Sequence, residues 1–149
     1  MRRAFKFRLY PTADQTRELG IMLETHRRLY NAALDQRRYA WRARGRSLSY
    51  LDQAADLKDA FASDEWLRRT NYSSCQATLR RLDRAFRNFF RRVKERHPRP
   101  GHPRFKGPDF FDSAEFPSHG DGVKLVGNRL RVQHVGTVKV KLHRPVEGK

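Results

Sequence analysis

Cysteine, acidic residues and long apolar runs are scarce in this sequence of 149 residues. Cys75 is the single cysteine, which excludes a disulfide framework and a cysteine-ligated zinc site within the chain. No apolar run approaches the roughly 18 residues that a membrane span needs, and no signal peptide is recognisable. These absences predict a soluble cytoplasmic protein with no membrane partner.

The residue patterns of common active sites are also missing. No phosphate-binding or dinucleotide-binding glycine pattern occurs, and the six histidines are scattered without metal-ligand spacing. Five of the 16 acids gather in one segment, residues 52–65, which is better explained as the solvated face of a helix than as a metal site. We therefore predict no catalytic residue, no metal site and no cleavage by this chain alone.

Basic residues, in contrast, are abundant. Lysine and arginine number 33 against 16 acids, which gives a net charge of +17 and a pI near 11.1, and 25 of the 33 are arginine. A GC-rich genome would explain the arginine preference equally well, but arginine also suits phosphate contacts and base stacking. Such a charge is expected beside a polyanion, and nucleic acid is the commonest one.

One stretch, residues 71–106, organises the chain. Apolar residues recur at three- and four-residue steps from Asn71 to about Arg96, which predicts an amphipathic helix with a buried face. This face contains Cys75, Leu79, Leu82, Phe86, Phe89, Phe90 and Val93. We expect the three phenylalanines to be core residues and not platforms for nucleic-acid bases.

A second face of the same helix is basic. Arg80, Arg84, Arg87 and Arg91 recur at helical steps away from the apolar face. The alternative to an anion-binding stripe is a solvated face, but residues 80–106 hold eleven basic residues and only two acids. Three prolines then end the helix and form a loop that closes with Arg104, Phe105 and Lys106.

Strands are predicted at both ends of the chain and helices between them. Residues 2–10 alternate as a half-buried strand, and Thr12 with Gln15 forms a capping box for a helix that runs to about Arg44. Ser47 or Ser49 caps a second helix. Residues 110–116 could form a strand, Gly127-Asn128 predicts a hairpin, and residues 138–142 a further strand. The fold class is therefore α+β, with a β-barrel or sheet built from both ends of the chain.

The end of the first long helix mixes arginines and aromatics. Residues 37–46 contain five arginines, among them Arg37, Arg38 and Arg42, with Tyr39 and Trp41 between them. Arginine with stacking aromatics is expected for single-stranded nucleic acid, although both aromatics could equally pack in a core.

Four segments together carry a family resemblance. They are Arg8-Leu-Tyr-Pro-Thr12, Tyr30-Asn31, Leu82-Asp-Arg-Ala-Phe-Arg-Asn-Phe-Phe90 and Gly101-His-Pro-Arg-Phe-Lys106. In order and spacing these segments closely resemble the start of the TnpB (OrfB) proteins of insertion sequences, relatives of the compact type V CRISPR effectors. The resemblance covers essentially the whole chain, and the last two segments together are its most specific part.

The resemblance implies a wedge-type β-barrel with an inserted helical recognition domain. The first barrel strand would be residues 1–10, the recognition domain residues 11–107, and the rest of an incomplete barrel residues 108–149. In the family these parts bind the guide RNA and a short transposon-adjacent motif in double-stranded DNA. Cleavage belongs to a downstream RuvC-like nuclease domain, so Mg²⁺ and Zn²⁺ are implied only for a full-length member. A member would lie in the bacterial or archaeal cytoplasm, with the nucleoid when bound to DNA.

Two groups of residues become candidates for nucleic-acid contacts. By alignment, Tyr50, Tyr72 and Gln76 fall where family members approach the DNA motif, although Tyr72 stands where at least one relative has lysine and Tyr50 could simply pack. The expected backbone contacts are Arg37, Arg38, Arg42, Arg80, Arg84, Arg87, Arg91, Arg104 and Lys106. Besides the binding half of an RNA-guided nuclease, a stand-alone non-cleaving binder or repressor and a basic protein of ribosomal type remain open.

Overall fold

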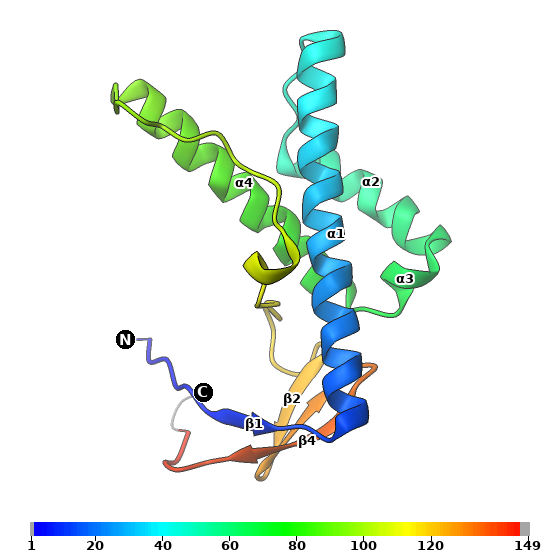
Figure 1. Cartoon of the computed structure of the whole chain (residues 1–149). Helices are drawn as coiled ribbons and strands as arrows, with labels where there is room; N and C mark the ends of the chain where they lie inside the picture. The colour runs from blue at the N-terminus through cyan, green and yellow to red at the C-terminus, as the bar shows by residue number, and fades with distance from the viewer. Residues whose placement is uncertain (1, 147–149) are drawn as a thin grey trace.

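The computed structural model describes residues 2–146, and these residues form four α-helices and one four-stranded sheet (Figure 1). In chain order the elements are β1 (Arg8–Tyr10), α1 (Ala13–Arg44), α2 (Tyr50–Ser63), α3 (Glu65–Arg68), α4 (Tyr72–Lys94), the 3-10 turn η1 (Pro108–Phe110), β2 (Val123–Val126), β3 (Arg129–Val132) and β4 (Gly136–Lys141). The α+β class predicted from the sequence is confirmed. No helix among the described residues is long and apolar enough to span a membrane.

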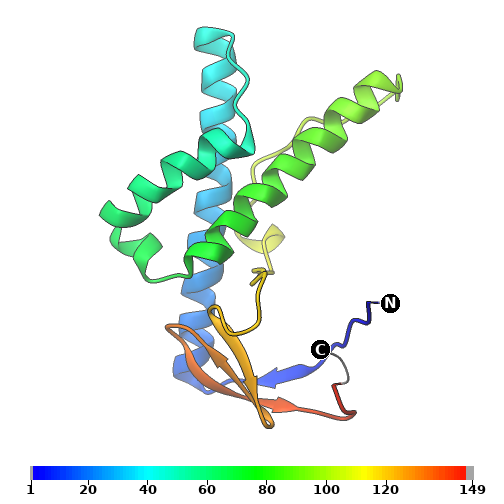
Figure 2. The ribbon, with the colours of Figure 1, turned by 180° about the vertical axis from the view of Figure 1, so that it is seen from behind.

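Local signals define the long first helix. The Thr12 side chain accepts from the Gln15 backbone, and the Gln15 side chain accepts from the Thr12 backbone, so the predicted capping box is present. Gly45 ends α1 in the left-handed conformation, with a φ of 59° that suits glycine. The result is a continuous helix of 32 residues that extends from the sheet through the whole helical part (Figure 2).

The other helices pack against α1 and enclose the core. Ser49 caps α2 through a capping box with Asp52, Asp64 caps α3, and the Asn71 side chain accepts from the Ser74 backbone to cap α4. The buried cluster consists of Tyr30, Ala33, Leu34, Leu57, Leu67, Cys75, Leu79, Leu82, Phe86 and Phe111. The apolar face predicted for α4 is thus confirmed over its first four turns.

The outer end of the apolar face predicted for α4 is exposed. Phe90 is 56% and Val93 49% exposed, whereas Phe86 is buried, so the prediction that all three phenylalanines of α4 are core residues is wrong for Phe90. In Figure 1 the far end of α4 leans away from α1, and no neighbouring helix covers it. Leu51, in the first turn of α2, is also exposed.

A histidine and a serine form a buried polar pair in the core. The ring of His26 on α1 contacts the Met22 carbonyl oxygen through Nδ1 (2.6 Å) and the Ser74 hydroxyl through Nε2 (2.6 Å). A neutral ring satisfies both partners when Nδ1–H donates to the carbonyl and Nε2 accepts from the hydroxyl. Burial lowers the pKa of His26, so the neutral form is favoured in the folded protein.

The sheet joins the two ends of the chain. Its strand order is β1-β4-β3-β2, all antiparallel, and Leu9 of β1 lies opposite Val140 of β4. The predicted hairpin is present, with Val126 opposite Arg129 across the turn at Gly127. The prediction of a sheet built from both ends is confirmed. Within residues 2–146 this sheet is open, with β1 and β2 as its edges, and they form no closed barrel.

Two of the predicted strands differ from the observed ones. The first strand covers only residues 8–10 of the predicted 2–10, although Phe5, Phe7 and Leu9 are half-buried and the residues between them exposed, as the alternation indicates. Residues 110–116 form no strand. Phe111 is instead buried against Tyr30 of α1, with ring centroids 6.0 Å apart, so this segment crosses from the helices to the sheet as a loop held by its aromatic residue.

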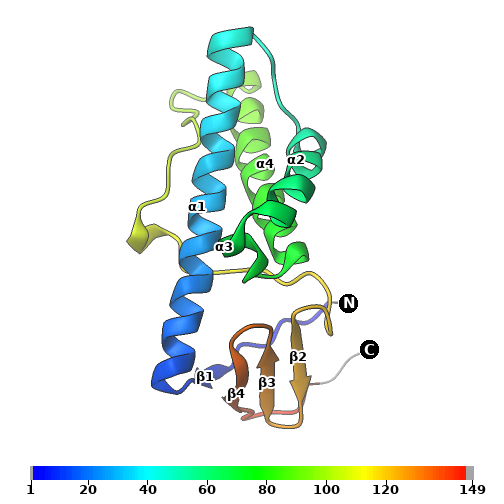
Figure 3. The same ribbon diagram turned by 90° about the vertical axis from the view of Figure 1, so that its right-hand side faces the viewer.

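Side-chain amides connect the sheet to the helices. Nδ2 of Asn71 donates to Asp121 Oδ1 and to Gln133 Oε1, both at 2.9 Å, while its Oδ1 caps α4. Ser73 also donates to Asp121, and these hydrogen bonds hold the pKa of that carboxyl below its usual value. At the base of α1, Gln15 Nε2 donates to the Thr137 carbonyl oxygen at 2.8 Å. Figure 3 shows the sheet below the helices, at the end where α1 begins.

Candidate nucleic-acid interface

The loop after α4 is held against α1 by a side-chain amide. We call residues 97–107 the proline loop. Oδ1 of Asn31 accepts from the Lys106 backbone nitrogen (2.8 Å), and its Nδ2 donates to the Lys106 carbonyl oxygen (2.9 Å). Arg27 donates to the same carbonyl at 2.9 Å. Two segments that carry the family resemblance, Tyr30-Asn31 and Gly101 to Lys106, are therefore in direct contact across 75 positions of sequence.

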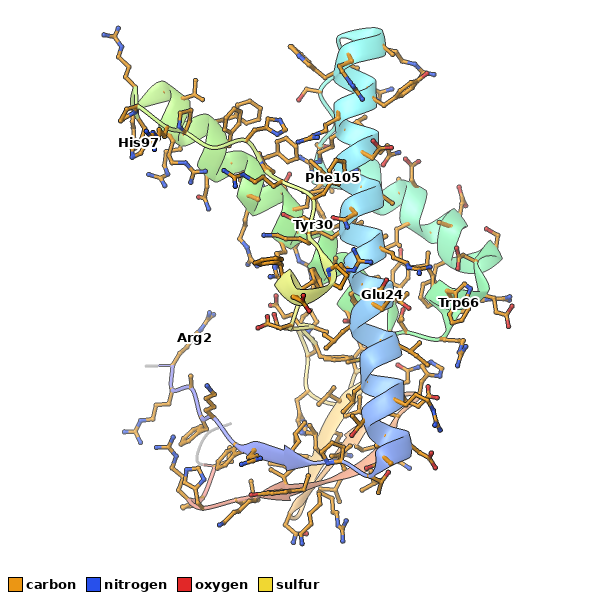
Figure 4. All side chains as sticks on the ribbon, viewed as in Figure 1. Arg2, Glu24, Tyr30, Trp66, His97 and Phe105 are labelled. Atoms are coloured by element: carbon orange, nitrogen blue, oxygen red, sulfur yellow. The ribbon has the colours of Figure 1, made fainter. Side chains whose placement is uncertain are left out.

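Arginines fix the rest of the proline loop. Arg38 donates to the Pro103 carbonyl oxygen at 3.2 Å, and its guanidinium lies 4.7 Å from the centre of the Phe105 ring. On the other side, Arg92 of α4 donates to the Pro100 and Gly101 carbonyl oxygens. Figure 4 shows Phe105 beside α1. A loop without regular structure thus has defined backbone partners on two helices.

The two basic residues predicted in this loop differ in position. Arg104 is exposed, and its side chain is open to a ligand. Lys106 is partly buried, with its ammonium 5.9 Å from the centre of the Tyr30 ring. The backbone of Lys106 therefore holds the loop in place, while its side chain lies along the surface of α1.

The predicted basic face of α4 is exposed. We call Arg80, Arg84, Arg87 and Arg91 the arginine stripe, and all four side chains lie on the surface. Their acidic contacts are Arg84–Glu115 (3.9 Å), Arg87–Asp83 (2.9 Å) and Arg91–Glu95 (3.2 Å), and none involves the acidic helix α2. Exposed pairs of this kind contribute about 0–1 kcal/mol, so phosphate oxygens can replace the carboxylates at little cost.

Arg37, in contrast, is an interior residue. It is 8% exposed, and its guanidinium donates to Gln53 (2.7 Å) and Asp83 (3.0 Å) and lies 4.9 Å from the centre of the Phe86 ring. Its hydrogen-bonding groups face protein partners, because α2 and α4 both pack over this turn of α1. This corrects the placement of Arg37 among surface phosphate contacts. Arg38 is half-buried and Arg42 is exposed, and their phosphate contacts stay predictions.

The three residues expected to face the DNA motif gather around one side of α4. Tyr72 and Gln76 are one turn apart, and Arg80 follows after another turn. Arg80 donates to the Tyr50 hydroxyl at 2.9 Å and lies 5.5 Å from the centre of the Tyr50 ring, which adds the start of α2 to the same face. Tyr72 packs edge-on against Phe61, with centroids 5.2 Å apart. Tyr50, Tyr72 and Gln76 are all partly buried, so each presents only part of its side chain to solvent.

A groove of about 720 Å³ lies between the far halves of α1 and α4. We call it the aromatic groove. It is lined by Trp41, Leu48, Phe86, Phe89, Phe90 and His102, together with Arg37, Arg38, Arg42 and Ser47. The Phe89 ring lies 5.3 Å from Phe90 and 5.1 Å from His102, centroid to centroid. From the sequence, only Trp41 and the arginines were predicted as nucleic-acid contacts, and the three phenylalanines were assigned to the core. The available signal was an apolar face on α4 that continues beyond the residues α2 can cover.

The described carboxylates do not form a metal centre. Within residues 2–146 no group of three or more His, Cys, Asp or Glu side chains could hold a metal ion. Asp52 caps its own helix, and hydrogen bonds from Ser49 lower its pKa. Glu24 accepts from Arg27 and Arg28, which lowers its pKa to about 2. These two acids thus serve a helix end and ion pairs.

Comparison with known proteins identifies the N-terminal segment. Residues 1–46 match the helix-turn-helix domain family of OrfB proteins from IS605-type elements. The chain is related to the TnpB/OrfB proteins. Within the matched TnpB/OrfB segment, residues 2–46 contain strand β1 and one uninterrupted helix, α1.

Two curated relatives extend this TnpB/OrfB relationship along the chain. A protein of Streptomyces pristinaespiralis, assigned as an RNA-guided DNA endonuclease, is 38% identical over 101 residues, which cover 66% of this chain and 25% of that protein. A protein of Escherichia coli, assigned as the RNA-guided DNA endonuclease InsQ, is 30% identical over 150 residues, which cover 97% of this chain and 35% of that protein. The chain thus spans about a quarter to a third of the length of these relatives.

Proposed function

We propose that this chain is the nucleic-acid-binding part of a TnpB-like RNA-guided DNA endonuclease. The observation that carries the proposal is the exposed arginine stripe of α4 in a chain of net charge +17 whose relatives are assigned as RNA-guided DNA endonucleases. Arginine side chains on one helix face can follow consecutive phosphates of a polynucleotide. The guide RNA is the proposed ligand of the arginine stripe, together with Arg38, Arg42, Arg104 and Lys106.

Double-stranded DNA is the second proposed partner. Tyr50, Tyr72 and Gln76 share one side of α4 with Arg80, which combines hydrogen-bonding side chains with a cation for the phosphate backbone. Phosphate contacts would position the duplex and the polar side chains would read base edges. This face is therefore the proposed reader of the transposon-adjacent motif.

The proposed domain division follows the same family pattern. Residues 11–107 would form the recognition domain, and residues 1–10 with 108–149 would belong to a wedge-type barrel. The open edges of the observed sheet support this division, because β1 and β2 each have one side available for a further strand. The nuclease domain of a longer protein is the proposed protein partner, and cleavage would belong to that domain.

A salt series on the whole chain tests the proposed role of the stripe. Each phosphate contact contributes roughly 0.7–0.9 to the slope of log affinity against log salt concentration. Changing Arg84 and Arg87 to Gln should therefore weaken RNA binding at low salt and reduce this slope by about 1–2. Folding should be retained, because both side chains are exposed and Asp83 keeps Arg37 as a partner.

The matched control removes the same charge elsewhere. Arg17 and Arg28 are exposed on α1, outside the stripe, and pair with Asp14 and Glu24. Their double change to Gln should leave the slope within about 0.5 of the unchanged protein. Equal effects of the two double variants would show that total charge, and not the stripe, drives binding. An unchanged slope in the Arg84 and Arg87 variant would show that the stripe is only a solvated face.

A further inference from the structure

The aromatic groove has a composition that the phosphate-binding role does not explain. Trp41 is 64% and Phe90 56% exposed in this groove. Folded proteins normally cover neighbouring aromatic rings unless the patch binds a partner. The groove volume of about 720 Å³ lies in the range of pockets that hold small organic groups. An organic ring system is therefore a suitable occupant, and the charge of the rim decides which kind.

The rim of the groove is cationic. None of the lining residues is acidic, and Arg38 and Arg42 border the aromatic rings. The Arg42 side chain makes no ion pair or hydrogen bond with any residue in the range 2–146, so its guanidinium is available to a ligand. Arg37 lies deeper, with its charge balanced by Asp83. The site therefore suits a ligand that combines a flat aromatic ring with a negative group a few ångströms away.

The floor of the groove is preformed. Phe86, Phe89 and Phe90 contact one another or His102 with centroids 5.1–6.3 Å apart, and Nδ1 of His102 lies 3.0 Å from the Pro103 carbonyl oxygen. The proline loop that carries His102 is itself fixed to α1 through Asn31. A ligand would enter between aromatic rings that are already in place, so little ordering entropy would be lost on binding.

We infer that the aromatic groove holds an unpaired nucleobase of single-stranded RNA, with the neighbouring phosphate on Arg42. This inference rests on the proposed function and names a subsite within it. Bases in a duplex are stacked and cannot enter, whereas bases in RNA loops and bulges are splayed out and stack on aromatic side chains. Trp41 and Phe90 provide the stacking faces for this base. The arginine stripe of α4 binds the phosphates of the paired regions of the same RNA.

Tryptophan fluorescence gives a direct readout, because the chain has two tryptophans and they are well separated. Trp41 lies in the groove, whereas Trp66 belongs to α3 and is stacked with Arg69, on the opposite side of α1 from Phe105 (Figure 4). In the full chain carrying Trp66→Phe, Trp41 is the only tryptophan. An RNA hairpin with an unpaired loop should quench its emission, and a blunt RNA duplex of equal charge should bind without quenching it.

The reciprocal protein, with Trp41→Phe, is the matched control and should show no quenching with either RNA. A hairpin with abasic loop positions keeps the phosphates and lacks the bases. It should bind the unchanged protein about 5- to 150-fold more weakly, the range expected for losing one stacked base. Phe90→Ala should weaken the intact hairpin by a similar factor and leave duplex binding unchanged, and its exposed side chain makes misfolding a small concern.

The outcomes separate this inference from the proposed function. Binding of both RNAs, measured by anisotropy, without any change in Trp41 emission would overturn the base-binding groove and leave the proposed function standing. Equal quenching by hairpin and duplex would also overturn it, as would stronger quenching by a DNA hairpin of the same sequence, which would assign the groove to displaced DNA. Failure to bind any nucleic acid would overturn both.

Discussion

Asn31 and Lys106 form a reciprocal pair of hydrogen bonds. The side-chain amide of Asn31 bonds both the backbone nitrogen and the carbonyl oxygen of Lys106, as a neighbouring β-strand would. The pair joins the middle of α1 to the end of the proline loop. Because that loop has no regular structure of its own, its position depends on side chains of α1 and α4. The geometry of the aromatic groove depends in turn on this contact through His102.

Removing the Asn31 amide should therefore loosen the loop. Asn31→Ala leaves a partly buried backbone nitrogen and carbonyl of Lys106 with fewer partners, which costs about 1–3 kcal/mol of unfolding free energy. Urea denaturation should report this loss, and trypsin should cut faster after Arg104 and Lys106. Asn88→Ala, at an exposed position of α4, is the control and should change neither. Unaltered proteolysis in Asn31→Ala would show that Arg27 and Arg38 hold the loop without it.

Stability should fall below neutral pH because of His26. Burial lowers its pKa in the folded state below the ordinary value of 6.5, so the unfolded chain binds a proton that the folded chain does not. The contribution is fully present above pH 6.5 and is lost as the pH falls below it, by at most about 1.4 kcal/mol per pH unit. Urea unfolding between pH 5 and 7 measures this slope. His26→Gln should flatten it, while His97→Gln, at an exposed site, should not.

The aromatic residues of α4 should differ sharply in their effect on stability. Phe86→Ala removes a buried ring and should cost about 3–5 kcal/mol, whereas Phe90→Ala should change stability by less than about 0.5 kcal/mol. Thermal melts should accordingly shift by roughly 6–20 °C for the first variant and hardly at all for the second. A large shift for Phe90→Ala would mean that the groove is closed in solution, against the structure described here.

The contact between the sheet and α4 should be sensitive to one methyl group. A Cβ at Gly122 would lie 2.6 Å from Nδ2 of Asn71, where a φ of +83° already disfavours any side chain. Gly120 has a comparable φ of +94° but open space around it. Gly120→Ala should therefore show only the backbone strain, about 1–3 kcal/mol, and Gly122→Ala a clearly larger loss in urea denaturation. Equal losses would show that Asn71 moves aside freely.

Short-range rules predicted the elements whose determinants lie within a few residues. The capping box at Thr12, the end of α1 at Gly45 and the hairpin at Gly127 all follow from local backbone requirements, and each is present. The apolar face of α4 was also predictable, but its exposed end was not. Whether Phe90 is covered depends on how far the neighbouring helices reach, and periodicity contains no information about the length of a partner.

The candidate site was less predictable because its contacts are long-range. Charge counting identified the arginine stripe, but it could not distinguish the buried Arg37 from the half-buried Arg38 beside it. That difference arises from α2 and α4, which pack over one side of α1 only. The contact between Asn31 and the proline loop likewise joins residues 75 positions apart, which no local pattern specifies.

The length of α1 has a geometric consequence for any nucleic acid bound along it. Gln15 contacts the sheet and Arg42 borders the aromatic groove, both on the same unbroken helix. At 1.5 Å per residue these positions lie about 40 Å apart along the helix axis. The unbroken helix therefore sets the distance, about 40 Å, that a nucleic acid must span to contact both the sheet and the aromatic groove.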